Sequence, residues 1–174
     1  MNLEYFIASL PMLAQGRPAA ISPEAFQEAC DSSLSPALAG AVRAILDDQE
    51  ADDPFVRAWR ARDTQIRNAV ARRRAARLGV PAPAVRPFDG FDAQVEPAVN
   101  AAFEEKDPLR REQALDALRW RVAEDLQGVA PFSAAVVLAY AAKLRILARE
   151  GAIDEAAGRE RFRQLSTYKK AQNA

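Results

Sequence analysis

Eight arginines fall within 21 residues of the chain, and they form its most conspicuous set of side chains with binding chemistry. Guanidinium groups bind carboxylates and phosphates through paired hydrogen bonds, so the run can serve an acidic protein or a nucleic acid. It can also form a solvated helix face that pairs with the acidic residues just before it. The arginines are Arg57, Arg60, Arg62, Arg67, Arg72, Arg73, Arg74 and Arg77, and the acids are Asp47, Asp48, Glu50, Asp52 and Asp53.

The charge balance argues against nucleic acid but leaves both an acidic protein partner and a solvated, internally paired helix face open. The 24 basic and 24 acidic residues cancel, and exposed aromatic residues do not alternate with the arginines, which argues against nucleic acid. Lys143 interrupts an otherwise apolar segment, where its stem can reach the surface or its charge can await an acid from a partner. The candidate protein-interface residues are therefore Arg67, Arg72, Arg73, Arg74, Arg77 and Lys143.

Catalytic and cofactor-binding patterns are not found in the sequence. The chain has no histidine to act as a general base or metal ligand, and its seven glycines form no phosphate-binding loop. Its carboxylates are interpreted as solvated helix-face residues, and Cys30 as a buried thiol in a reducing compartment. We therefore expect no catalytic residue, no metal, no cofactor, no small-molecule substrate and no enzymatic activity.

The elements that must position these residues begin with a repeated signal, a capping side chain followed by proline. It marks four helix starts at Ser22-Pro23, Ser35-Pro36, Asp53-Pro54 and Asp107-Pro108. Gly79 and the prolines after it predict a helix end and a long loop over 79–93. The predicted helices are 23–31, 36–48, 54–78, 93–105, 108–127 and 133–150, with a last one capped by Asp154 and a polar tail over 166–174.

This pattern predicts that several apolar side chains point into the core. Phe88 and Phe91 are expected to hold the loop against the body. The opening segment is expected to be buried through Tyr5, Phe6, Ile7 and Leu10, and Leu109 is expected to form a second buried stripe with Trp120. Phe132 is expected to act as a hydrophobic staple before an N-cap at Ser133. The residues from Gly128 to Ala142 carry no charge, so the helix that contains them should be covered on more than one side.

Together these elements predict an all-α fold, a single-domain bundle of six or seven helices that spans residues 1–174. The N-terminus lacks the basic residues of a signal peptide, and no uncharged run reaches the roughly 20 residues of a membrane span. We therefore expect a cytoplasmic protein that inserts no segment into a membrane and meets one only through a partner complex.

Three segments resemble a small, uncharacterised bacterial family encoded beside the subunits of V-type ATPases. They are YFIASLPML at 5–13, AISPEAFQEAC at 20–30, and the stretch over 117–162, which begins with ALRWRVAEDL and ends with GRERF. The residues that stand at the characteristic positions of that family are Tyr5, Ser9, Leu10, Pro11, Trp120, Phe132, Tyr140, Lys143, Leu144 and Arg149.

The Ser-Pro-Glu-x-Phe start at 22–26, and the alanine-tyrosine helix that leads through a basic segment to a final short helix, more loosely resemble the helical V-type ATPase subunit called C in bacteria and archaea and d in eukaryotes. The usual glutamate-isoleucine-arginine sequence of that subunit is replaced here by Lys143-Leu144-Arg145. That subunit joins the central stalk to the membrane ring, and this chain is about half its length. The resemblance implies a non-catalytic accessory or stalk-associated component that acts through protein contacts with V-type ATPase subunits. A stable subunit, an assembly factor and a regulator all fit it. The alternative is a stand-alone helical adaptor or nucleic-acid-associated module that uses the arginines.

Overall fold

The computed structural model describes residues 2–152 of the 174. In that range it contains seven helices and no strand, which confirms the all-α prediction. The expected helix after Asp154 and the tail 166–174 lie outside the described residues. The helices are α1 (Leu3–Ser9), α2 (Pro23–Ser33), α3 (Pro36–Leu46), α4 (Pro54–Leu78), α5 (Val95–Glu104), α6 (Pro108–Gln127) and α7 (Ala134–Gly151).

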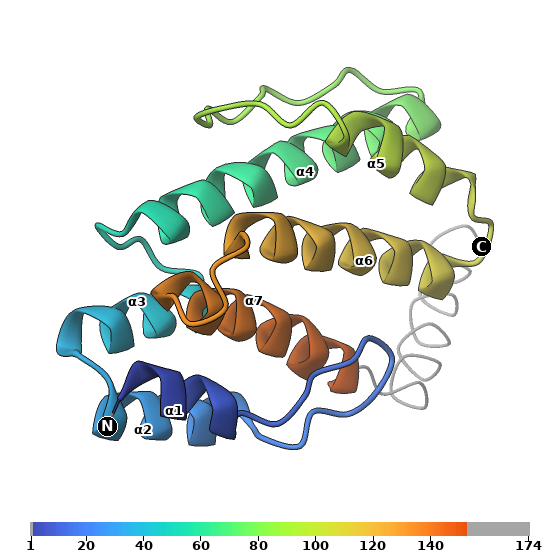
Figure 1. The fold of residues 1–174 in the computed structure, drawn as a ribbon. Coiled ribbons are helices and arrows are strands. Elements are labelled where there is room, and N and C mark those ends of the chain that lie inside the picture. The colour runs from blue at the N-terminus through green and yellow to red at the C-terminus, as the bar shows by residue number, and fades with distance from the viewer. Residues whose placement is uncertain (1, 153–174) are drawn as a thin grey trace, which may run out of the picture.

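The helix α7 lies at the centre of the arrangement. It packs against α1, α2, α3, α4 and α6 (Figure 1). Its buried side chains include Val137, Leu138, Leu144 and several alanines, whose small size lets neighbouring helices approach on more than one side. This confirms the central position expected for the uncharged stretch. On the far side of α6, α4 and α5 form the next layer.

The four predicted capping sites are all present. Ser22 and Ser35 accept hydrogen bonds from the backbone N–H groups of Ala25 and Leu38 at 3.2 and 3.3 Å. Asp53 accepts two such bonds at the start of α4, and Asp107 accepts one at the start of α6. At the other end of α4, Gly79 adopts the left-handed conformation with φ 67°, as its position predicts.

Three of the apolar assignments, those of Tyr5, Leu109 and Phe132, are wrong. Tyr5 is 66% exposed because α1 is only two turns long and turns Phe6, its neighbour, to the core. Leu109 and Phe132 are each 51% exposed, so neither the second stripe of α6 nor the staple forms as expected. Ser133 does occupy the N-cap of α7, but its hydroxyl donates to the carbonyl of Ala130 instead of capping the helix.

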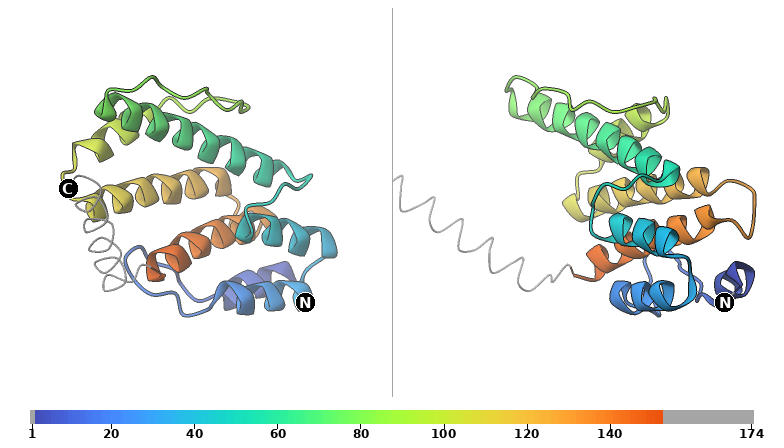
Figure 2. Two further views of the ribbon diagram at one scale, coloured as in Figure 1. Left: turned by 180° about the vertical axis from the view of Figure 1, so that it is seen from behind. Right: turned by 90° about the vertical axis from the view of Figure 1, so that its left-hand side faces the viewer.

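The loop 79–93 is held by amide side chains of α4, and of the two aromatic residues expected to hold it, Phe88 is partly buried whereas Phe91 is exposed. Phe91 is 67% exposed, which corrects the prediction that it pins the loop. Instead the buried side chain of Asn68 donates to the carbonyl of Arg86 at 2.8 Å and accepts from its N–H at 3.0 Å. Gln65 makes the same pair of bonds with Asp92 at 2.8 and 3.0 Å. The loop therefore runs along the outer side of α4, opposite α6, in both views of Figure 2.

We expect Asn68→Ala to release the middle of the loop. The change removes two hydrogen bonds worth about 1 kcal/mol each, so hydrogen exchange at the Arg86 amide should accelerate by about tenfold or more. Asn100→Ala, on the exposed side of α5, is the matched control and should leave the exchange of residues 80–93 unchanged. Equal exchange in the two variants would show that the amide pair does not hold the loop.

Candidate protein-binding surface

Six of the eight arginines of α4 fall into two groups according to the acidic residues that pair with their guanidinium groups. In the first half of the helix, Arg57, Arg60 and Arg67 pair with acids from the segment that precedes α4. In the second half, Arg72, Arg73 and Arg74 pair with glutamates of α5 and α6. The two groups lie in different surroundings.

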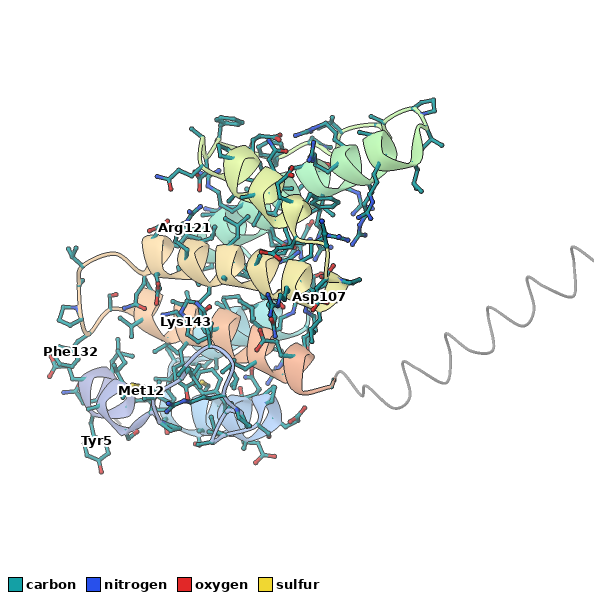
Figure 3. All side chains as sticks on the ribbon, turned by 90° about the vertical axis from the view of Figure 1, so that its right-hand side faces the viewer. Tyr5, Met12, Asp107, Arg121, Phe132 and Lys143 are labelled. Carbon is teal, nitrogen blue, oxygen red and sulfur yellow. The ribbon has the colours of Figure 1, made fainter. Side chains whose placement is uncertain are left out.

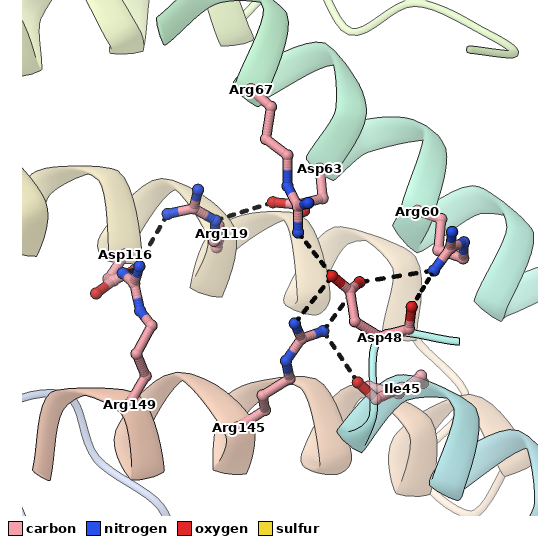
Figure 4. Close-up of polar contacts among 9 residues, drawn as sticks. All are labelled: Ile45, Asp48, Arg60, Asp63, Arg67, Asp116, Arg119, Arg145 and Arg149. Carbon is pink, nitrogen blue, oxygen red and sulfur yellow. Dashed lines mark hydrogen bonds and ion pairs between the residues drawn. The ribbon is translucent and has the colours of Figure 1, made fainter. Parts of the chain in front are cut away.

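Asp48 is the first centre of a polar network between helices (Figure 4). Its carboxylate contacts Arg67 at 2.9 Å, Arg145 of α7 at 3.3 Å and Arg60 at 3.6 Å. Burial alone would raise the pKa of Asp48, but the hydrogen bonds and charges of Arg145 and Arg67 lower it below its ordinary value. Its φ of 59° lies in the left-handed region, which aspartate tolerates better than most residues.

Asp63 and Asp116 extend this network across α4, α6 and α7. Arg119 of α6 bridges them, with its Nε 2.9 Å from Asp63 and its Nη1 3.2 Å from Asp116. Asp63 also pairs with Arg67 at 2.6 Å, and Asp116 pairs with Arg149 of α7. The side chain of Asp116 is only 4% exposed, so its charge depends on these two guanidinium groups. We call Asp48, Asp63 and Asp116 with Arg60, Arg67, Arg119, Arg145 and Arg149 the aspartate network.

The interpretation of the arginine run as a helix face paired with the preceding acids is therefore correct only for the first half of α4. Asp48, Glu50 and Asp52 pair as expected, whereas Asp53 caps the helix and Asp47 ends α3. The partners of the second half lie 24 to 38 residues further along the chain, where sequence spacing gives no signal. The interpretation of all carboxylates as solvated is also wrong, because Asp116 is buried.

The end of α4 combines weakly paired arginines with exposed apolar side chains. Arg73 and Arg74 lie 3.4 Å from their glutamate partners, a long distance for an ion pair, and Arg77 has no ion pair within residues 2–152. Of the large apolar residues exposed in the described range, four lie within residues 78–91. Two of them, Leu78 and Val80, adjoin the arginines at the end of α4. We call this surface the basic end; it consists of Arg73, Arg74, Arg77, Leu78 and Val80.

Lys143 neither extends freely to the surface nor stays unpaired, the two possibilities that the sequence indicates. Its side chain is 15% exposed, and its Nζ lies 3.2 Å from Glu124 of α6 and 5.2 Å from the ring centroid of Trp120. The indole N–H of Trp120 donates to the same glutamate at 2.9 Å. The lysine therefore finds its counter-charge within the chain, between α6 and α7 (Figure 3), and does not await an acid from a partner.

The residues that carry the family resemblance lie mostly around α1 and α7. The hydroxyl of Tyr140 donates to the carbonyl of Pro11 at 2.9 Å, and burial raises the pKa of this tyrosine to about 12. Ser9 donates to the carbonyl of Phe6, and Leu10 caps the end of α1. The exposed Tyr5 and Phe132 point outward at the same end of the molecule (Figure 3).

Groups with catalytic potential are scarce in the described part of the chain. Burial raises the pKa of the Cys30 thiol to about 12, with a smaller contribution from Asp31, so the thiolate that would act as a nucleophile is disfavoured. Among residues 2–152, no cluster of three or more acidic or cysteine side chains is arranged to hold a metal ion. No helix in that range is both long and apolar enough to cross a membrane.

Comparison with protein families yields one match. Residues 94–171 match the family model described as "Protein of unknown function (DUF2764)". The matched part includes α5, α6 and α7, and α1 to α4 precede it. Comparisons with curated proteins and with solved structures gave no match. The family description names no activity and no partner, so the link to V-type ATPases stays a prediction based on the resemblance described above.

The buried position of Asp116 gives a direct test of the aspartate network. Asp116→Asn removes the counter-charge of Arg149 and one of the two carboxylates that bind Arg119, so we expect the free energy of unfolding to fall by about 2 kcal/mol. Asp52→Asn, which removes an exposed partner of Arg57, should cause no measurable change. Urea unfolding measures both values. A loss for Asp116→Asn no larger than that of the control would contradict the structural role assigned to this network.

Proposed function

We propose that this protein is a non-catalytic accessory or stalk-associated component of a bacterial V-type ATPase, and that it acts through protein-protein contacts. The resemblance of three of its segments to a family encoded with V-type ATPase subunits supports the choice of complex. We propose that the protein lies in the cytoplasm and reaches the membrane surface only through its contacts with the partner complex. Within this proposal a stable subunit, an assembly factor and a regulator remain three possible roles.

The observation that carries the proposal is the composition of the basic end. Protein interfaces combine apolar or aromatic contacts with arginine, and a rim charge directs the approach of a partner of opposite charge. Here Arg74 lies beside the exposed Leu78 and Val80, and Arg77 lies on the same end of α4. The bonds from Gln65 and Asn68 hold the loop 79–93 in place, so a partner would meet a preformed surface.

The ion pairs that the arginines of α4 make within the chain also argue against nucleic-acid binding. A phosphate backbone is bound by cations that are free to neutralise it, and each one adds to the salt dependence of binding. In this chain Arg60, Arg67 and Arg72 are already paired with carboxylates. Binding nucleic acid along the whole of α4 would require these ion pairs to be given up.

Affinity purification of the tagged protein from its own bacterium in mild detergent, followed by mass spectrometry, tests the proposal. We expect V-type ATPase subunits to copurify with the wild-type protein. The variant Arg74→Glu with Leu78→Ser should reduce their recovery by about tenfold, since it reverses a rim charge and removes an exposed apolar contact. Its matched control is Arg57→Glu with Met12→Ser, which makes the same changes away from the basic end and should retain full recovery.

Circular dichroism should show equal helix content in both variants, because all four side chains are exposed. Recovery of nucleic acid without ATPase subunits, together with a gel shift that weakens steeply with salt, would favour the stand-alone adaptor instead. Equal recovery of the subunits by both variants would retain the complex but discard the basic end as its docking surface.

A further inference from the structure

A hollow of about 410 Å³ opens where the end of α4 meets the turn between α5 and α6. Four cationic side chains and two carboxylates line it, so the lining carries a net charge of +2. Three of the cations come from helices and one from the turn, which distributes the charge around the hollow. The charged residues are Arg73, Arg77, Lys106 and Arg111, with Glu104 and Glu105.

Phe103 fixes two of these guanidinium groups in place. The Cζ atoms of Arg111 and Arg73 lie 5.3 and 5.9 Å from the centroid of its ring, within the range of cation–π attraction. Arg111 also donates to the backbone carbonyl of Glu105 at 2.7 Å. These contacts restrict both side chains without neutralising them, apart from the long pair between Arg73 and the exposed Glu104.

The same two arginines are incompletely hydrogen-bonded. The Nε atoms of Arg73 and Arg111 are buried and have no hydrogen-bond partner within residues 2–152. A guanidinium group that has lost part of its hydration gains more from a new carboxylate at its remaining N–H groups than a fully solvated one does. The hollow therefore presents preorganised, partly desolvated donors to an anion.

A second hollow is also lined by arginines, but these are already paired with carboxylates of the chain. About 260 Å³ of space adjoins the aspartate network and is lined by Arg67, Arg119, Arg145 and Arg149. There the guanidinium groups are bound to Asp48, Asp63 and Asp116, of which Asp116 is almost fully buried. An anion entering that space would compete with carboxylates that the fold already supplies. The hollow around Phe103 has only exposed glutamates as competitors.

We propose that the hollow around Phe103 binds an acidic segment of a partner protein, with two or more aspartate or glutamate side chains that pair with Arg73, Arg77 and Arg111. The charges favour a segment over a compact phosphate because Glu104 and Glu105 lie among the cations and repel a concentrated dianion. Carboxylates on a chain that advances about 3.3 Å per residue can reach the separate cations. This inference rests on the proposed function, since it names the chemistry of the partner at the basic end.

The test uses the full-length protein and N-acetylated hexaglutamate as the probe, titrated by calorimetry. We expect saturable binding that weakens with salt, and about tenfold weaker binding for Arg77→Gln combined with Arg111→Gln. Arg110→Gln is the matched control, because Arg110 is a neighbouring α6 arginine that does not line the hollow, and it should bind like the wild type. Arg77→Gln alone should also weaken binding, and its exposed side chain makes a folding defect no explanation.

Three outcomes would overturn the inference: no binding of hexaglutamate, equal binding by all variants, or inorganic phosphate competing as well per charge as the peptide. These outcomes are separate from a failure of the proposed function. If V-type ATPase subunits copurify while hexaglutamate does not bind, only the acidic-segment inference is discarded. If hexaglutamate binds as predicted but no ATPase subunit copurifies, the hollow remains an acidic-peptide site and the proposed complex is discarded.

Discussion

Ion pairs between aspartates and arginines of different helices set how α4, α6 and α7 lie together. Asp116 and Asp63 would be costly to bury as isolated charges, so their positions require Arg119 between them and arginines from α4 and α7 beside them. Asp48 adds the α3–α4 connection to the same network. The apolar core supplies the driving force for packing α6 on α7, and the network fixes how α4 lies across them.

This constraint divides α4 into a structural and an exposed half. Arg60 and Arg67 are committed to the network and hold the helix to its neighbours. Beyond them the helix continues past the network to Gly79, and its last arginines lie beside an anchored loop with exposed apolar side chains. One continuous run of arginines in the sequence therefore has two physical roles. We propose a protein-binding role only for the second half of α4, where the guanidinium groups are weakly paired and can bind carboxylates of a partner.

Local signals in the sequence predicted four helix starts well because each of them depends on two adjacent residues, such as Asp53 and Pro54. The all-α fold and the central position of α7 followed from such signals and from apolar spacing. The network could not be predicted in the same way. Only the pairs Asp63–Arg67 and Asp116–Arg119 have helical spacing, and the others join residues from 12 to 97 positions apart. The amide bonds from Asn68 to the loop, and the position of Phe103 between two arginines, likewise depend on tertiary contacts.

The central claim is that the end of α4 and its loop form the surface that meets a partner. Hydrogen exchange of the free protein and of the protein bound to its copurified complex tests this most directly. We expect increased protection of backbone amides within residues 72–93 and 103–111. Protection confined instead to the opposite surface, around the exposed Tyr5, Met12 and Phe132, would contradict it and would assign docking to the apolar residues at that end.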